Sequence, residues 1–241
     1  MNHFIVKSIP RAQSDLSISE ELATFGVATV AESQSKIGIM DDGLKPLQEG
    51  RSVAGPAVTV KCFDGDNLMV HAALEFCERG DIMVISSMTS TQHGYFGELL
   101  AMACKRREIG GVVIDGGIRD TQRIRSMSFP VWSRHRNAAG TSKNRPGWVN
   151  IPIVCGNVCV HPGDYIVADD DGVVVVNRDE VNTVISNCRA RIKKEENTKE
   201  RIERGELSVD FYGLKKVLDE LGVKYLDRDE GGQRHVDKGR E

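Results

Sequence analysis

Residues 94–120 read GYFGELLAMACKRREIGGVVIDGGIRD, and the pattern within this stretch predicts the fold. Apolar side chains recur at helical spacing between Leu99 and Cys104, while charged residues take the opposite face. The glycines at 110 and 111 are typical of the end of a helix. The stretch therefore predicts a glycine-containing loop that leads into an amphipathic helix.

A buried strand is predicted directly after this helix. The β-branched run at residues 112–114 is followed by Asp115-Gly116-Gly117, which reads as a tight turn. Similar strand patterns stand at residues 82–85 and 131–132, and a second short helix is expected over residues 120–127. Strands that alternate with helices predict an α/β fold whose strands run parallel.

Three polar residues are spaced by one crossover of such a sheet. Glu98 is separated by twenty residues from Arg119 and Asp120, and each follows the end of a predicted strand. The carboxyl ends of parallel strands share one crevice, where open α/β sheets usually bind ligands. Taken alone, the same residues also fit a glycine-rich turn with a surface ion pair, so spacing leaves both interpretations open.

The start of the predicted helix adds a possible anion site to this crevice. Gly97 lets the backbone come close to a ligand, and the N–H groups of Leu99 and Leu100 can hold a carboxylate. Together with two carboxylates and an arginine, this set suits a hard divalent cation and a small keto acid.

Several segments resemble one known family: GYFGELLA, GVVIDGGIRD, FPVW, IPIVCGNVCVHPGDYIVADDDGVVVV and RGELSVDFYGLKKVLDELGVKYL. They are similar to class II pyruvate aldolases that cleave 4-hydroxy-4-methyl-2-oxoglutarate and 4-carboxy-4-hydroxy-2-oxoadipate, which share a superfamily with the regulators of ribonuclease E activity. The resemblance spans residues 5–226. It implies a layered α/β sandwich of the swivelling β/β/α type with a long C-terminal helical arm, assembled as a homotrimer or homohexamer.

The resemblance also implies roles for individual residues. Asp120 is expected to bind Mg²⁺ or Mn²⁺ directly, while Glu98 and Glu195 of a neighbouring subunit hold the waters of the metal. Glu196 takes this role if the register is shifted by one residue. Arg119 is expected to bind the enolate oxygen. The family often has Asp at the position of Glu98.

Two further segments resemble substrate-binding parts of the family. In GDNLMVHAALE, residues 65–75, Asn67 is expected to face the substrate, although an asparagine that stabilises its own turn is the alternative. In GTSK, residues 140–143, Lys143 is expected to reach a distal carboxylate, and a solvated loop lysine is the alternative. His71 is interpreted as a packed residue of the helix that follows Asn67.

These roles imply a lyase, a metal-dependent aldolase that releases pyruvate together with oxaloacetate or a second pyruvate. Oxaloacetate decarboxylase side activity is expected because loss of carbon dioxide yields the same enolate. The resemblance places the enzyme in bacterial breakdown of aromatic compounds. The alternative function is a non-catalytic protein-binding regulator of ribonuclease activity.

Composition limits the other classes of partner. The chain has 241 residues, a net charge of −3 and 40% hydrophobic residues, which fits a globular domain with an ample core. The balanced charge gives no basic footprint for nucleic acid, and no apolar run approaches a membrane span. Because residues 1–10 also lack a signal-peptide pattern, we expect a cytoplasmic protein with neither nucleic acid nor membrane as partner.

The domain organisation follows from the C-terminal pattern. Residues 1–178 are expected to form the catalytic domain, residues 179–226 a helical arm that contacts a neighbouring subunit, and residues 227–241 a disordered tail. The arm is expected to leave its own core because its apolar stripe ends at Ile192. Six cysteines without a CxxC pair are expected to be reduced packing residues, including Cys159.

Overall fold

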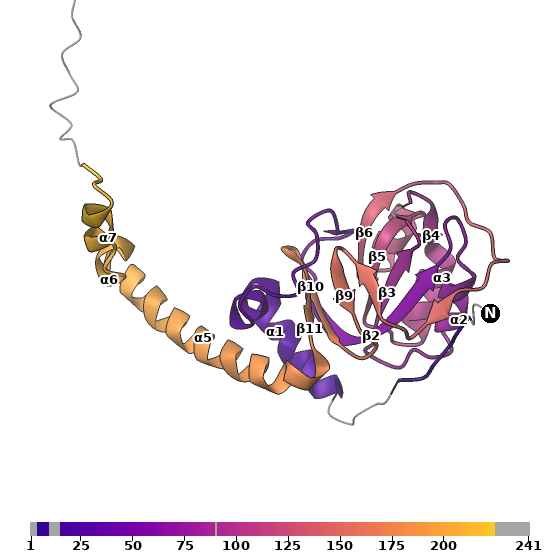
Figure 1. Ribbon diagram of the computed structural model, residues 1–241, viewed down its shortest axis with the longest axis horizontal. Helices are drawn as coiled ribbons and strands as arrows, with labels where there is room; N and C mark the ends of the chain where they lie inside the picture. Colours follow the sequence, from indigo (N-terminus) through magenta and orange to yellow (C-terminus); the bar gives the residue numbers. More distant parts are fainter. Residues whose placement is uncertain (1–3, 10–14, 90, 225–241) are drawn as a thin grey trace, which may run out of the picture. The chain divides into compact units, whose positions relative to one another are not determined.

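The computed structural model describes residues 4–9, 15–89 and 91–224. The chain forms two compact units, residues 1–192 and residues 193–241. Figure 1 labels the elements of both units along the chain.

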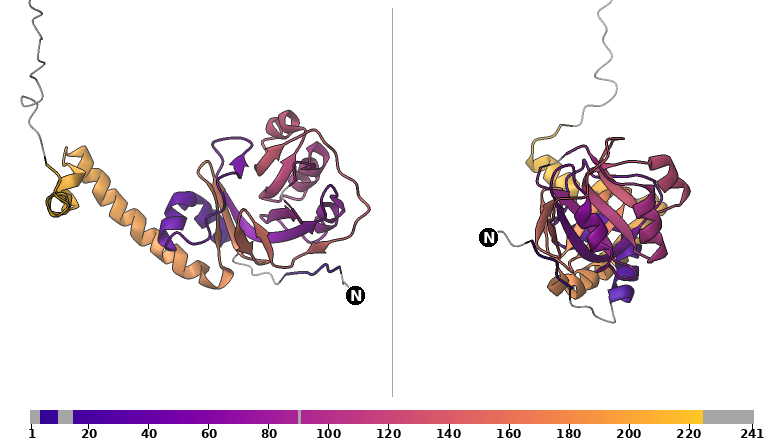
Figure 2. Two further views of the ribbon diagram at one scale, coloured as in Figure 1. Left: turned by 45° about the horizontal axis from the view of Figure 1, so that its top comes forward. Right: turned by 90° about the vertical axis from the view of Figure 1, so that its right-hand side faces the viewer.

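The strands of the first unit are β1 (Lys45–Pro46), β2 (Val53–Cys62), β3 (Ile82–Ser87), β4 (Gly94–Phe96), β5 (Gly111–Ile118), β6 (Val131–Arg136), β7 (Trp148–Val149), β8 (Ile153–Cys155), β9 (Val158–Val160), β10 (Tyr165–Asp169) and β11 (Gly172–Val176). Within the described residues, one large sheet has the order β1-β6-β5-β3-β2-β10-β11, with β4 beside β5 and β7 beside β2. The strands β8 and β9 form a separate hairpin. The large sheet curves into a nearly closed, barrel-like form (Figures 1 and 2).

The helices are α1 (Asp15–Ser33), α2 (Leu68–Ala73), α3 (Glu98–Arg106), α4 (Thr121–Ser126), α5 (Val181–Glu203), α6 (Ser208–Phe211) and α7 (Leu214–Glu220). The strands β2, β3, β5 and β6 run parallel, and α3 and α4 provide the crossovers around β5. The expected α/β class and the order β3, α3, β5, α4, β6 are therefore confirmed.

Alternating residues of the parallel strands pack on opposite faces of the sheet. Val58 and Met83 belong to the core beneath α2, α3 and α4, while Ala57 and Val84 face the interior of the curved sheet. Trp132 is fully buried in that interior, and its indole N–H donates to the carbonyl oxygen of Asp169 at 2.8 Å. A third core lies between α1, the start of α5 and the β10–β11 hairpin.

The sequence Asp115-Gly116-Gly117 is part of β5, so the tight turn expected there is wrong. The strand continues to Ile118 because β4 pairs alongside it, and a side chain at Gly117 would collide with the carbonyl oxygens of Gln92 and His93. Asp115 accepts hydrogen bonds from Arg134 and from the backbone N–H of Gly156 instead of closing a turn.

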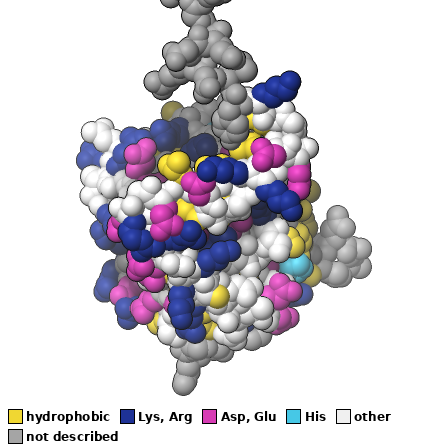
Figure 3. Space-filling model, turned by 90° about the vertical axis from the view of Figure 1, so that its left-hand side faces the viewer, with side chains coloured by type: hydrophobic (Ala, Val, Ile, Leu, Met, Phe, Trp, Pro, Cys, Tyr) yellow, Lys and Arg dark blue, Asp and Glu magenta, His cyan; other side chains and the backbone are white. Residues whose placement is uncertain are grey.

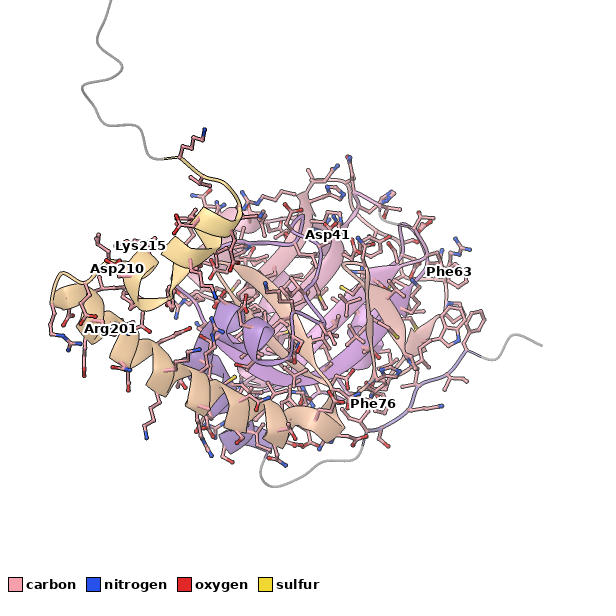
Figure 4. All side chains as sticks on the ribbon, turned by 60° about the vertical axis from the view of Figure 1, so that its left-hand side comes forward. Asp41, Phe63, Phe76, Arg201, Asp210 and Lys215 are labelled. Carbon is pink, nitrogen blue, oxygen red and sulfur yellow. The ribbon has the colours of Figure 1, made fainter. Side chains whose placement is uncertain are left out.

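The second unit contains the later part of α5 and the helices α6 and α7. None of the side chains in α6 or α7 is buried. Its polar contacts are local, because Arg201 pairs with Glu206 at 2.7 Å and Lys215 pairs with Asp210. Figure 4 labels Arg201, Asp210 and Lys215 on these three helices.

The predictions for the C-terminal part of the chain differ in their outcomes. The buried residues of α5 are Val181, Val184, Ile185 and Cys188, so burial ends one turn before Ile192, which is only partly buried. The boundary after residue 178 and the contact of the arm with a neighbouring subunit stay predictions. The tail expected over residues 227–241 lies outside the described residues.

Cysteine burial agrees with the sequence analysis except at one position. All six thiols are free, and five of them are buried. Cys159 is exposed because the β8–β9 hairpin pairs it with the outward-facing Val154, so its packing role is wrong.

None of the helices in residues 4–9, 15–89 and 91–224 is long and apolar enough to cross a membrane. On the face seen in Figure 3, acidic and basic side chains are interspersed.

Candidate active site

A cleft of about 320 Å³ lies where β2, β4 and β5 end in the first unit. This volume falls within the range of small-molecule sites, roughly 300–1,000 Å³. Its lining includes eight residues that the sequence analysis singled out: Asn67, Gly97, Glu98, Leu99, Leu100, Arg119, Asp120 and Lys143. Four further residues complete the lining: His71, Gly94, Tyr95 and Thr141.

Two groups of residues line this cleft. We call one group the acidic wall, which consists of Gly97, Glu98, Arg119 and Asp120 at the ends of β4 and β5. The loop wall consists of Asn67, His71, Thr141 and Lys143, which come from the start of α2 and from the segment between β6 and β7.

Backbone pairing between β4 and β5 builds the acidic wall. Phe96 pairs with Ile118, and the N–H of Arg119 donates to the carbonyl oxygen of Phe96 at 2.9 Å. The residues that follow each strand, Gly97 and Arg119, therefore emerge side by side. The crossover argument from the sequence predicted this meeting, although it did not predict the short strand β4.

Asp120 adopts an unusual backbone conformation for a residue other than glycine. Its φ of 54° and ψ of 33° lie in the left-handed region, and it precedes α4. Its carboxylate makes no capping bond to α4 and instead accepts a hydrogen bond from the N–H of Glu98, at 3.1 Å from Oδ2. Asp120 thus places a negative charge at the start of α3, where the helix dipole favours it.

Glycine at position 97 leaves room for the carboxylate of Asp120, which any larger residue would displace. A Cβ atom at this position would come within 2.6 Å of Oδ2 of Asp120 and within 3.3 Å of Nε of Arg119. Its φ of −145° is extended and open to any residue, so space and not backbone strain requires glycine here.

Arg119 and Asp120 point into open solvent at the cleft. Arg119 Nε lies 3.6 Å from Oδ2 of Asp120, and the two side chains are 46% and 42% exposed. Such an exposed pair contributes little to stability, so both groups are available to a ligand. The N–H groups of Leu99 and Leu100 lie in the first turn of α3 and have no acceptor within the helix, which is the arrangement by which helix starts bind anions in other proteins.

Asn67 carries a buried polar atom that lacks a partner. The residue is 5% exposed, and its Nδ2 donates to the carbonyl oxygen of Tyr95 at 2.8 Å. Oδ1 has no hydrogen-bond partner among the residues that the structure describes. Buried polar atoms are rarely left unsatisfied, so this oxygen is a candidate acceptor for a ligand hydroxyl group.

His71 and Lys143 influence each other across the loop wall. His71 is exposed at the cleft, so its interpretation as a packed residue is wrong. Partial burial and then the positive charge of Lys143 lower the pKa of His71 below its ordinary value of 6.5. The imidazole is therefore neutral at neutral pH, and Lys143 provides the positive charge of this wall.

The residues of the acidic wall fit a divalent cation that retains most of its water. Among the described residues, no group of three His, Cys, Asp or Glu side chains converges as a preformed metal cage. Asp120, which is exposed, and Glu98, which is partly buried, offer carboxylate oxygens at the cleft, and these are hard donors of the kind that Mg²⁺ and Mn²⁺ prefer. Mg²⁺ is commonly bound through one or two carboxylates with several waters retained, and this donor set matches that habit.

Glu195 and Glu196 do not contribute to the described lining of the cleft. All twelve lining residues belong to the first unit, whereas both glutamates lie on the part of α5 in the second unit. Their expected role in a neighbouring subunit therefore stays a prediction.

Comparison with known proteins adds two kinds of relative. A family model described as RraA-like, Aldolase/RraA, matches residues 27–175. A protein of Halalkalibacterium halodurans named "Putative 4-hydroxy-4-methyl-2-oxoglutarate aldolase" is 29% identical over 207 residues, which is 86% of this chain and 98% of that protein. Streptomyces coelicolor RraAS2, a member of the RNase ES inhibitor RraA protein family, is similar in structure with a TM-score of 0.69 and 29% identity, covering 77% of this chain and 98% of its own. The RNA-processing inhibitor RraA of a Thermus species has a TM-score of 0.57 and 25% identity, covering 62% of this chain and 90% of its own.

Proposed function

This chain belongs to the RraA-like family of aldolases and RraA proteins, and within that family we propose that it is a class II pyruvate aldolase. Its substrates are 4-carboxy-4-hydroxy-2-oxoadipate, 4-hydroxy-4-methyl-2-oxoglutarate or both. The products are pyruvate with oxaloacetate or a second pyruvate. Decarboxylation of oxaloacetate is a side activity of the same site.

One observation carries the proposal. The cleft combines a carboxylate pair, an arginine and a helix start on its acidic wall with a lysine on its loop wall. A small keto acid with carboxylates at both ends matches these charges. Groups that can bind a carboxylate lie at both walls, whereas acidic groups lie at only one wall.

The chain's own residues bind and orient the substrate. The N–H groups of Leu99 and Leu100 hold the carboxylate next to the 2-keto group. Arg119 binds the 2-keto oxygen and stabilises the negative charge that develops there, because its guanidinium stays cationic and presents several donors. Lys143 binds the distal carboxylate, and Oδ1 of Asn67 accepts a hydrogen bond from the C4 hydroxyl group until this group turns its proton to the water that removes it.

Cleavage breaks the bond between C3 and C4 of the substrate. The bonding electron pair passes toward C3 and the 2-keto oxygen and gives the enolate of pyruvate. The C4 hydroxyl group loses its proton to a water held by Asp120 or Glu98 and becomes the keto group of the second product. Protonation of the enolate at C3 then yields pyruvate.

Mg²⁺ or Mn²⁺, when bound, supplies Lewis-acid polarisation of the 2-keto oxygen. Asp120 and Glu98 would hold this cation in the chain described here. The proposal adds Glu195 of a neighbouring subunit in a homotrimer or homohexamer, with Glu196 as the alternative residue. This assembly and a cytoplasmic location rest on the resemblance and on composition.

A regulator of ribonuclease activity is the competing function, because the family includes such proteins. Relatives of both kinds cover most of this chain, 86% for the relative named as an aldolase and 77% for RraAS2, so the residues that line the cleft, and not the extent of similarity, favour the aldolase.

Pyruvate release tests the proposal. We expect turnover of 4-carboxy-4-hydroxy-2-oxoadipate or 4-hydroxy-4-methyl-2-oxoglutarate with Mg²⁺, measured through lactate dehydrogenase and NADH, and no turnover with EDTA. Asp120→Ala should lower kcat by at least about 1,000-fold, since metal polarisation contributes several kcal/mol and each 1.4 kcal/mol is about tenfold. Asp171→Ala is the matched control, because Asp171 lies in the exposed β10–β11 turn outside the cleft.

Folded protein that releases pyruvate from neither substrate would contradict the aldolase and favour the regulator. If Asp120→Ala is as active as Asp171→Ala, Asp120 has no role in catalysis. The aldolase reaction would then depend on other residues.

A further inference from the structure

We propose that Asp66 is a positioning residue that holds the loop wall in place and thereby determines how well the cleft binds a substrate with a distal carboxylate. This inference rests on the proposed aldolase function. Asp66 does not line the cleft; it lies directly before Asn67 and is 1% exposed. It acts on the substrate through its neighbours and through the segment that carries Lys143.

One oxygen of Asp66 holds the loop that contains Lys143. Oδ2 accepts three hydrogen bonds: from Oγ of Ser142 at 2.6 Å, from the N–H of Asn144 at 2.8 Å and from the N–H of Arg145 at 3.2 Å. Lys143 lies between two of these donors in the sequence. The backbone that presents its side chain to the cleft is therefore tied to one carboxylate oxygen.

The other oxygen holds the start of α2. Oδ1 accepts a hydrogen bond from the N–H of Leu68 at 2.9 Å. Two backbone hydrogen bonds reinforce the link. The N–H of Asn67 donates to the carbonyl oxygen of Ser142 at 3.0 Å, and the N–H of Ser142 donates to the carbonyl oxygen of Gly65 at 2.8 Å. Asp66 thus connects both segments of the loop wall, which are 76 residues apart in the chain.

Only a carboxylate satisfies this arrangement. Donors approach both of its oxygens, and an amide would turn an NH₂ group toward N–H or O–H donors at one end, whichever way it is oriented. Burial raises the pKa of Asp66, but the hydrogen bonds from Ser142, Asn144 and Leu68 outweigh burial and lower the pKa below its ordinary value of 3.8. The group is ionised throughout the pH range of an enzyme assay.

The consequence for the substrate depends on its length. The carboxylate next to the 2-keto group, the 2-keto oxygen and the water that takes the C4 proton lie at the acidic wall, whose position depends on the pairing of β4 with β5. The distal carboxylate of 4-carboxy-4-hydroxy-2-oxoadipate reaches Lys143 on the loop wall. Loosening the loop wall therefore weakens binding of the longer substrate and leaves the chemistry at the acidic wall intact.

Asp66→Asn separates these effects. For 4-carboxy-4-hydroxy-2-oxoadipate we expect KM to rise about tenfold with kcat little changed, since loss of an ordered contact worth about 1.4 kcal/mol is a factor of ten. For Mg²⁺-dependent decarboxylation of oxaloacetate we expect kcat/KM to stay within about twofold of the wild type. Ser142→Ala removes one of the bonds to Asp66 and should shift the same KM in the same direction by a smaller factor, and it serves as the test if Asp66→Asn does not fold.

Asp81→Asn is the matched control. Asp81 is also 1% exposed and accepts a hydrogen bond from the N–H of Glu78, but it precedes β3 at the opposite end of the sheet. It should lower the thermal unfolding midpoint without changing the ratio of the two activities. Equal losses on both substrates in Asp66→Asn, matched by Asp81→Asn, would reduce Asp66 to a structural role and overturn the inference.

The wild type separates this inference from the proposed function. A wild type without turnover overturns the aldolase, and the inference falls with it. A wild type that is active, combined with an unchanged KM in Asp66→Asn and Ser142→Ala, overturns the inference alone.

Discussion

The two walls of the cleft are held in place by different kinds of interaction. The acidic wall is positioned by backbone pairing between β4 and β5 and by the missing side chain of Gly97. The loop wall depends on the side chain of Asp66, which bridges two segments far apart in the chain. The position of a wall fixed by main-chain register depends mainly on backbone pairing, whereas the position of a wall fixed by one carboxylate depends on that side chain.

This difference assigns separate tasks to the walls. Bond cleavage needs groups held within a fraction of an ångström, and regular secondary structure provides such rigidity. Recognition of a distal carboxylate needs a charge within reach, which a loop lysine provides. Substitutions in the acidic wall should lower turnover of every substrate, and substitutions in the loop wall should discriminate between substrates.

Gly97→Ala should have the largest effect among the remaining changes. The new methyl group would meet Oδ2 of Asp120 at 2.6 Å and displace the carboxylate, so kcat should fall about 100-fold for both the aldol substrates and oxaloacetate. Steady-state kinetics with the three substrates measures this loss. The control is Gly116→Ala, whose Cβ would meet the ring of Tyr95 at an ordinary 3.4 Å. A loss confined to one substrate would contradict the expectation that the acidic wall acts on every substrate.

Lys143→Met should have an intermediate effect. The change keeps the length of the side chain and removes its charge, so KM for 4-carboxy-4-hydroxy-2-oxoadipate should rise about tenfold, as expected for one charge-assisted hydrogen bond. Decarboxylation of oxaloacetate should change little. Lys36→Met, at an exposed lysine that follows α1 and pairs with Glu32 of that helix, controls for loss of charge. Equal losses with both substrates would place Lys143 in the chemistry and not in recognition.

The titration of His71 should show the smallest effect. Because burial and Lys143 lower its pKa, the folded protein binds this proton less readily than the unfolded chain does. The stability contributed by neutral His71 is therefore complete above pH 6.5 and is lost as the pH falls through the lowered pKa. NMR titration of the imidazole should give a pKa below 6.5 that rises toward 6.5 in Lys143→Met. A pKa that does not respond to this substitution would separate the two residues.

Local sequence patterns were sufficient to predict that the residues of the acidic wall meet, but their roles came from the resemblance. Helical spacing in α3 and the β-branched run of β5 predict a crossover, and the crossover brings Glu98 next to Arg119 and Asp120. The turn expected at Asp115 was wrong because pairing of β4 with β5 is a long-range contact, and glycines within a paired strand look the same in sequence as glycines in a turn.

The loop wall could not be derived from spacing. Asn67 and Lys143 were found only through resemblance to a family, because the bonds that bring them together join segments 76 residues apart. Asp66 was missed, since an aspartate between glycine and asparagine is typical of a turn that needs no partner. His71 was misassigned because an apolar run around a histidine does not reveal which side of a short helix faces the cleft.

The placement of β5 also affects which parts of the folded protein open locally. This strand is bonded to β3 on one side and to β6 on the other, with β4 beside its last residues. Amides in such a central strand exchange with solvent only through the rarest openings, while edge strands and loops open far more often. Arg119 and Asp120 directly follow this protected strand, so partial openings that release the loop around Lys143 leave these two proposed catalytic residues in position to meet the next substrate.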